Sequence, residues 1–161
     1  MKLDGKILTP EAQLRSFIDR FDPKEQKLFR SVRAAVRKRF PTAYELAYGY
    51  NHSVVISYSP TEHGIDGIVA ISARATGVAL YFNQGPQLPD PKKLLRGSGK
   101  QARFVPLDAA NQLADPVVEA MIDAAIDQAR VPLPTKGKGK LMIRGAAAKE
   151  QPRRKPTMRS S

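Results

Sequence analysis

Between Tyr44 and Phe82 the hydrophobic residues of the chain recur every second position, and short turns interrupt the pattern. The stretch YELAYGY (44–50) is followed by SVVISYS (53–59), GIVAISAR (67–74) and GVALYF (77–82). A period of two is typical of half-buried strands. Consecutive strands joined by short connections pair antiparallel, since parallel pairing needs a long crossover. The sequence therefore predicts an antiparallel meander, to which Arg103–Leu107 adds one further strand.

Helical patterns flank this predicted sheet on both sides. Thr9-Pro10, Asp22-Pro23 and Asp115-Pro116 each combine a capping residue with proline at the first helical position. Apolar residues at helical spacing follow each pair, and Pro41 and Pro132 end the second and the last pattern. A short helix near Lys92–Leu95 is also predicted. Helices with one apolar side need a sheet to cover, so we expect an α+β two-layer sandwich, with the N- and C-terminal helices packed on one face of an antiparallel sheet.

A chain of 161 residues is the size of one domain with a tail. We expect the domain to span residues 1–145, with a strand-like patch at Leu141–Ile143 packed against it, and residues 146–161 to form a basic tail, mobile from Lys149 onward. No run of about 18 apolar residues is long enough to span a membrane. The N-terminus has no signal-peptide pattern, and cysteine is absent. These features predict a cytoplasmic protein.

The positive charge is concentrated near the C-terminus. The chain has 27 Lys and Arg against 15 Asp and Glu, and residues 131–161 hold nine of the bases with one acid. The predicted second helix also has a basic side, formed by Lys27, Arg30, Arg33, Arg37, Lys38 and Arg39. The helix and the tail together suggest an anionic partner, such as a nucleic acid tracked through its phosphates. The alternatives are a solubilising tail and an ordinary solvated helix face.

The stretch LLRGSGKQARF (94–104) looks like a phosphate-binding loop but does not match one. A P-loop requires a glycine where this chain has Leu94 and a serine or threonine where it has Gln101. A P-loop also lies between a strand and a helix. The region still holds five bases and no acid between Pro91 and Leu107, so its glycines could form an anion-binding nest. The simpler interpretation, which we favour, is a glycine exit from the short helix.

Carboxylates at i, i+4 spacing follow one side of the last predicted helix: Asp115, Glu119, Asp123 and Asp127. Such a strip can attract a hard cation, but ligands on one helix do not surround an ion. The simpler interpretation is a solvated acidic face with Asp115 used as a cap. The two histidines match no known metal-site spacing, and no nucleophile motif is present, so the sequence leaves an enzymatic activity undecided.

The segments YELAYGYNHSVVISYSPTEHGIDGIVAI and LYFNQGPQLPDPKKLLRGSGKQARFVPL resemble the YdhG-like family of small bacterial domains, over about residues 10–145. The most specific match runs from Phe82 to Arg103. The resemblance implies a frataxin-like fold, and some members are described as iron chaperones that use an acidic ridge including the first helix. Here the early helices are neutral to basic, and only the strip from Asp115 to Asp127 is acidic.

We therefore expect a non-enzymatic binding module for an anionic ligand or nucleic acid, with no cofactor. The candidate contact residues are Tyr48, Arg96, Lys100 and Arg103, of which Arg103 is the family-motif residue least explained by turn formation. The alternative is a frataxin-like intracellular iron chaperone, in which the metal ligands are Glu119, Asp123 and Asp127.

Overall fold

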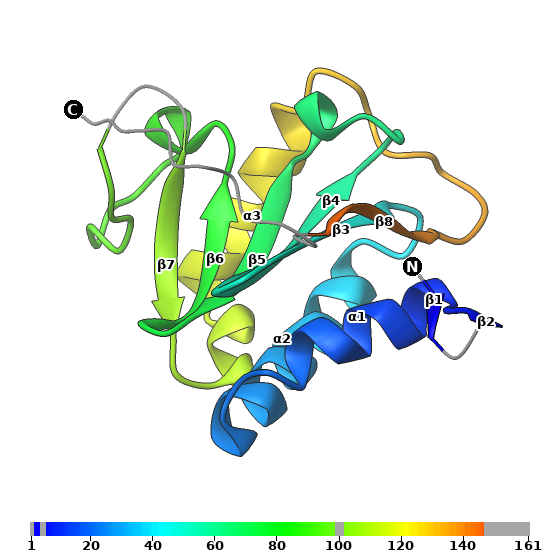
Figure 1. The fold of residues 1–161 in the computed structure, drawn as a ribbon. Coiled ribbons are helices and arrows are strands. Elements are labelled where there is room, and N and C mark those ends of the chain that lie inside the picture. Colours follow the sequence, from blue (N-terminus) through cyan, green and yellow to red (C-terminus); the bar gives the residue numbers. More distant parts are fainter. Residues whose placement is uncertain (1, 4–5, 99–101, 147–161) are drawn as a thin grey trace.

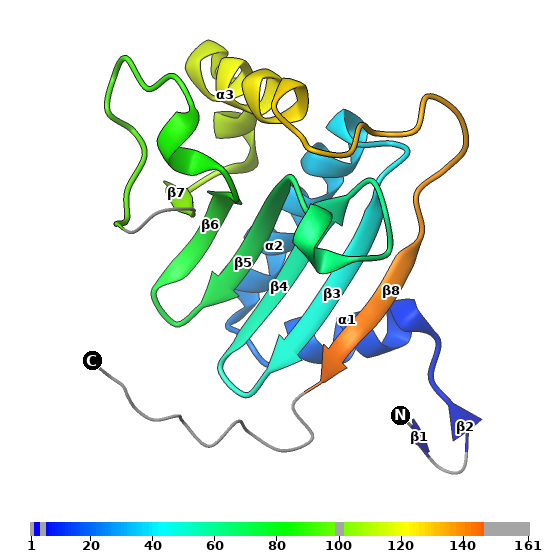
Figure 2. The same cartoon turned by 90° about the horizontal axis from the view of Figure 1, so that it is seen from above.

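A six-stranded sheet forms one layer of the molecule and the α-helices form the other (Figures 1 and 2). The computed structural model describes residues 2–3, 6–98 and 102–146. The strands are β3 (Tyr44–Tyr50), β4 (Ser53–Ser59), β5 (Val69–Arg74), β6 (Gly77–Phe82), β7 (Arg103–Leu107) and β8 (Leu141–Ala146). Their order across the sheet is β7-β6-β5-β4-β3-β8, and consecutive strands from β3 to β7 pair antiparallel. The predicted meander and the α+β sandwich are confirmed.

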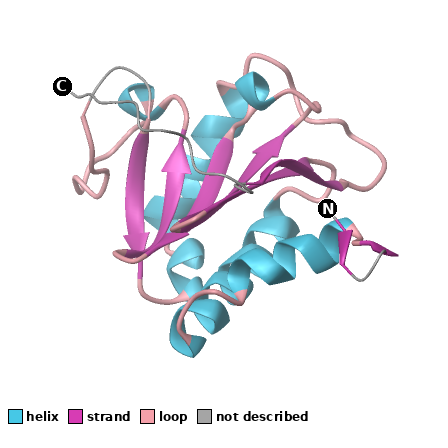
Figure 3. Cartoon of the chain, viewed as in Figure 1, coloured by secondary structure: helices cyan, strands magenta, loops and turns pink. Residues whose placement is uncertain are grey.

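The three α-helices begin where the cap-and-proline pairs predict. They are α1 (Pro10–Ile18), α2 (Pro23–Arg39) and α3 (Pro116–Asp127) (Figure 3). Thr9 caps α1 by accepting the amide of Ala12 at 3.1 Å, and Asp115 caps α3 through the amide of Val117 at 2.8 Å. Asp22 occupies the N-cap position of α2, but its side chain makes no capping hydrogen bond, so that part of the prediction is wrong. None of the helices among the described residues has the length and apolarity needed to cross a membrane.

Short elements complete the architecture. A two-stranded hairpin of β1 (Lys2–Leu3) and β2 (Lys6–Ile7) precedes α1. Single 3₁₀ turns lie at η1 (Gly64–Asp66), η2 (Gly85–Gln87) and η3 (Ala110–Ala114).

The hydrophobic core lies between the helices and one face of the sheet. The apolar sides of the helices contribute Phe17, Phe29, Val32 and Met121, all buried. The sheet contributes the alternate residues of its strands, among them Ile56, Ile71, Leu80 and Val105, which are cross-strand neighbours in register. These residues bury the apolar stripes that the sequence pattern predicts.

The last strand, β8, pairs parallel with β3 and gives the sheet a mixed edge. The sequence predicts a strand-like patch lying against the body, but not this direction. The chain leaves α3 at Asp127, crosses the end of the sheet and enters β8 after Gly139, whose amide donates to the carbonyl of Pro41 at 2.9 Å. The long crossing makes parallel pairing possible, because it returns the chain to the end at which β3 begins.

The predicted helix near Lys92–Leu95 is wrong. The chain there forms a turn, in which the Asp90 carboxylate accepts the amides of Leu94 at 2.7 Å and Leu95 at 3.0 Å. Lys93 adopts a positive φ of 56°, which interrupts any right-handed helix. Arg96 then forms an isolated β-bridge with Phe104, so Gly97, at φ 109°, follows a bridge residue and is not a helix exit. The Asp90 carboxylate thus accepts these two amides within a turn and does not cap a helix.

Two glycines of the crossing segment offer a matched test of how β8 is held. A Cβ on Gly139 would lie 1.7 Å from the carbonyl oxygen of Ala43, whereas a Cβ on Gly137 would meet nothing within 4 Å. We expect Gly139→Ala to lower the free energy of unfolding by about 2 kcal/mol or more, because backbone has to move. Gly137→Ala, which keeps only the penalty of φ 95°, should lower it by about 1 kcal/mol.

Urea unfolding of both variants measures these losses. Amide exchange in β8 should accelerate in Gly139→Ala alone. Equal losses for the two variants would show that the close approach to Ala43 does not hold the strand.

Candidate nucleic-acid interface

A buried carboxylate connects the sheet to the helix layer. Glu45 on β3 is only 5% exposed and points at α2. Arg33 of α2 donates to it twice, from Nε at 2.9 Å and from Nη2 at 2.8 Å, and the Tyr58 hydroxyl of β4 donates at 2.7 Å. Because a buried charge is costly unless it is paired and hydrogen-bonded, this geometry fixes which side of α2 faces the sheet.

The same guanidinium also joins α1 to the network. Arg33 donates from Nη1 and Nη2 to the two carboxylate oxygens of Glu11, at 3.1 Å and 2.9 Å. The hydrogen bond from Arg33 lowers the pKa of Glu11. Burial alone would lower the pKa of Arg33, but its bonds to Glu45 and Glu11 raise it, and burial raises the pKa of Tyr58 well above the ordinary value. One arginine therefore holds two carboxylates from different elements.

Internal carboxylates engage most of the predicted basic side of α2. Besides Arg33, Arg30 pairs with Asp19 at 3.0 Å, Arg37 lies 3.6 Å from Glu45, and Arg39 pairs with Asp123. Lys27 and Lys38 are the α2 members of that predicted set with no such partner among the described residues. The helix thus keeps little free charge for a phosphate backbone, and that part of the prediction finds no support here.

Of the predicted contact residues, Tyr48 lies far from Arg96 and Arg103. Arg103 begins β7 and its stem packs on Gly85, where a Cβ would lie 2.4 Å from that of Arg103, so this glycine of the family-like motif serves packing. Arg96 pairs with Phe104 beside the same edge, and Lys100 lies outside the described residues. Tyr48 is on β3, four strands and about 19 Å away. The structure therefore does not bring Tyr48 and Arg103 to one site.

The acidic strip of α3 is also partly engaged. Asp115 caps its helix and Asp123 pairs with Arg39, whereas Glu119 and Asp127 are exposed. Over the residues that the structure describes, no three His, Cys, Asp or Glu side chains come together in a group able to hold a metal ion. The iron interpretation stays a prediction without a ligand cluster behind it.

The sheet face opposite the helices has a different chemical character. Glu45 and Gly49 face the helix layer, where Glu45 meets Arg33 and a Cβ on Gly49 would touch Phe17, so the alternate tyrosines of β3 face the other way. We call this outward face the open face. Across the six strands of this sheet the only acidic residue is Glu45, so the open face carries no acid from any of them.

Aromatic rings stand on the open face near both sides of the sheet. Tyr48 and Tyr50 of β3 stack with ring centroids 6.4 Å apart and planes 6° from parallel, and Tyr81 of β6 stacks on Phe104 of β7 at 5.0 Å. All four side chains are half-buried. Between the pairs the floor consists of small side chains, such as Ala70 and Ala79, which are nine-tenths or more buried. The rings are therefore the aromatic surface that a partner can reach.

One end of the open face is more accessible than the other. The β4–β5 loop folds back over β3 and β4 (Figure 2), and a Cβ on Gly64 in this loop would come within 2.9 Å of the Tyr48 hydroxyl. At the opposite end lie the β3–β4 and β5–β6 hairpins and the end of β8. Tyr50 lies in register with Ser53, and Ser53 with Arg74, so these side chains line up across this end.

Two basic residues lie on strands to either side of β3 at this hairpin end. Arg74 of β5 and Arg144 of β8 are both exposed and have no carboxylate partner within the described part of the chain. Ala146, the last described residue, pairs with Gly49, the neighbour of Tyr50 in β3. The sequence of residues 147–161 holds five bases and one acid. We call Tyr48, Tyr50, Arg74 and Arg144 the hairpin-end cluster.

Sequence reasoning identified one member of this cluster, Tyr48, and missed the other three. The alternation of Tyr44, Leu46, Tyr48 and Tyr50 already placed the tyrosines on one face, which was the available signal. The position of Arg74 depends on strand register, and that of Arg144 depends on the parallel pairing of β8. A local sequence pattern predicts neither of these two positions.

Comparison with known proteins adds no neighbour, since no family model, curated protein or solved structure matches the chain. The YdhG-like resemblance and the frataxin-like fold remain predictions, and the function is argued from the site.

The buried ionic contact predicts a large difference between two arginines of one helix. Arg33→Gln leaves Glu45 buried with Arg37 at 3.6 Å as its nearest cation, so we expect a loss of about 3 kcal/mol in the free energy of unfolding. Arg30→Gln removes an exposed pair with Asp19 and should cost less than about 1 kcal/mol. Chemical denaturation measures both values, and similar losses would refute the structural role of Arg33.

The free energy of unfolding should depend on pH through the Glu11 carboxyl, and the direction of this dependence is defined. Its pKa is lower in the folded chain than in the unfolded chain, so its stabilisation is present above the unfolded pKa and is lost as pH falls through the folded pKa. Glu11→Gln should therefore be less stable than the wild type near neutral pH, by less than about 1 kcal/mol because the pair is exposed. The difference should vanish in acid. A difference that persists at low pH would mean that the bond to Arg33 is not its source.

Proposed function

We propose that the protein is a non-enzymatic module that binds single-stranded nucleic acid on the hairpin end of its open face. The observation that carries this proposal is a half-exposed stacked tyrosine pair on a sheet face that receives no acidic side chain from its strands. Aromatic rings on such a face stack with bases whatever their identity, because every base has a π-face.

The charges around the pair fit a sugar-phosphate backbone. Arg74 on β5 and Arg144 on β8 lie on either side of β3, the strand that carries Tyr48 and Tyr50, and the sequence of residues 147–161 is basic. Neutralising phosphates releases counterions and makes binding depend on salt. Sequence-independent binding of single strands combines two components, unpaired basic side chains and aromatic rings that stack with bases.

Single-stranded nucleic acid fits this site better than a duplex does. Bases in a duplex are stacked on each other and present only their edges, so the tyrosine rings have no base face to meet. The rings of Tyr48 and Tyr50 are nearly parallel and belong to one strand. A single strand can present the faces of its bases to the rings without first losing the base pairs of a duplex.

Removing one ring tests the stacking contribution. We expect Tyr50→Ala to weaken binding of a labelled single-stranded oligonucleotide by about 10-fold, in line with a stacking contribution of roughly 1–3 kcal/mol per base. Tyr50→Phe, which keeps the ring, should bind like the wild type. Tyr44→Ala is the matched control, because Tyr44 is half-buried on the same face at the other end of β3. Fluorescence anisotropy measures all four affinities.

Charge is tested in the same assay. Affinity should fall steeply between about 50 mM and 200 mM salt, and Arg74→Gln should reduce the salt slope by about 1. Lys27→Gln, which removes a charge from α2 in the helix layer, should not change it. Absence of binding at low salt, or equal affinity of Tyr50→Ala and the wild type, would refute the proposed interface.

A further inference from the structure

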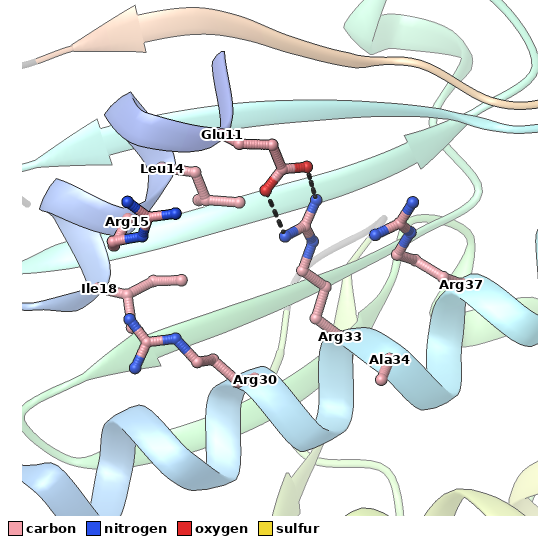
Figure 4. A pocket seen from close by; sticks show the side chains of 8 residues that line it. All are labelled: Glu11, Leu14, Arg15, Ile18, Arg30, Arg33, Ala34 and Arg37. Atoms are coloured by element: carbon pink, nitrogen blue, oxygen red, sulfur yellow. Dashed lines mark hydrogen bonds and ion pairs between the residues drawn. The ribbon is translucent and has the colours of Figure 1, made fainter. Parts of the chain in front are cut away.

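A second basic site lies in the helix layer, on the other side of the sheet from the hairpin-end cluster. We infer that the cleft between α1 and α2 binds a compact dianion, of the phosphate or phosphomonoester type. The cleft has a volume of about 330 Å³ and is lined by Glu11, Leu14, Arg15, Ile18, Arg30, Arg33, Ala34 and Arg37 (Figure 4). Four guanidinium groups thus line one cavity together with a single carboxylate.

Two of these arginines have donors to offer. The side chain of Arg15 on α1 makes no hydrogen bond or ion pair within the described residues. Arg37 on α2 approaches Glu45 only through Nε, at 3.6 Å, and its terminal amino groups make no hydrogen bond there. Figure 4 shows both side chains beside the Glu11–Arg33 pair, one from each helix. An anion in the cleft is therefore within reach of cations from two elements.

Glu11 already shows how an anion binds in this cleft. Both of its oxygens accept from the terminal amino groups of Arg33, and its side chain is 56% exposed. This two-point contact is the geometry that guanidinium groups form with carboxylates and phosphates alike. The deeper edge of Arg33 stays fixed by Glu45, so the outer edge is a preorganised anion site that a side chain of the protein occupies.

The resident carboxylate limits what kind of ligand can bind. A monoanionic carboxylate from solution would compete with Glu11 for the same two hydrogen bonds to Arg33. Glu11 is tethered at millimolar effective concentration, so the free carboxylate would gain no binding energy over it. A dianion with three or four acceptor oxygens also contacts Arg15 and Arg37, which Glu11 leaves free. The apolar side chains of Leu14, Ile18 and Ala34 exclude water from one side and strengthen these contacts. Phosphate and phosphomonoesters meet these requirements.

Titration of the full chain with inorganic phosphate near pH 8 tests the inference, because phosphate is then a dianion. The Nε–Hε signals of ¹⁵N-labelled arginines report on each guanidinium, and sodium chloride at matched ionic strength is the control. We expect saturable shifts at Arg15 and Arg37 with a Kd below about 1 mM. Parallel titrations with pyrophosphate and O-phosphoserine distinguish a free phosphate site from a phosphomonoester site by relative affinity.

Two substitutions should change the affinity in opposite directions. Arg15→Gln should weaken phosphate binding about 10-fold, and Glu11→Gln, which removes the competing carboxylate, should tighten it about 10-fold. Lys24→Gln removes one charge from an exposed position of α2 that does not line the cleft, and should leave the Kd unchanged.

Shifts that do not saturate, or that are equally large at Arg74, would overturn the inference. So would affinities of Arg15→Gln and Glu11→Gln that equal that of Lys24→Gln. Tyr50→Ala should bind phosphate like the wild type, because this site does not depend on the open face. Failure of the nucleic-acid proposal therefore leaves the result of this titration standing.

Discussion

The contact between Arg33 and Glu45 determines how the two layers of the molecule fit together. A carboxylate at 5% exposure beneath a sheet requires a cation and hydrogen-bond donors at fixed places, and α2 supplies the cation only in one rotation about its axis. The same guanidinium extends to Glu11, which fixes α1 relative to α2. Apolar stripes alone tolerate small rotations, since Leu, Ile and Val repack, whereas a two-point ionic contact does not.

This arrangement gives the two faces of the sheet different electrostatic characters. The helix side contains the acid of the sheet, Glu45, together with the arginines that neutralise it. The open face carries aromatic rings, hydroxyls and Arg74, and receives no carboxylate from the strands. Period-two alternation on β3 produces both results, because Glu45 points inward while Tyr44, Tyr48 and Tyr50 point outward. A shift of one residue in register would reverse this distribution.

The sequence predicts the sandwich correctly because local signals agree with the global fold: cap-and-proline pairs start α1 and α3, and alternation marks β3 to β7. It fails in two places, at one local turn and at one long connection. Asp90 satisfies amides of a turn near Lys92 where a helix is predicted, and the direction of β8 depends on where a long crossing returns. For the site, alternation indicates Tyr48. The sequence predicts Arg33 as a surface residue, because its partner Glu45 is 12 residues away on a strand.

The two proposed binding sites differ in how many of their basic side chains are already paired with carboxylates. Arg30, Arg33 and Arg39 are paired internally, so a count of basic residues along α2 overstates its attraction for phosphates. Two pairs of arginines are among the described residues that keep donors not bound by a carboxylate: Arg74 and Arg144 beside the tyrosine pair, and Arg15 and Arg37 around the cleft. The first place is open and flanked by rings, which suits an extended strand. The second is narrow and holds a resident carboxylate, which suits one compact group of higher charge. The two proposed ligand types are therefore distinguished by the shape of each site and the pairing of its arginines, more than by net charge.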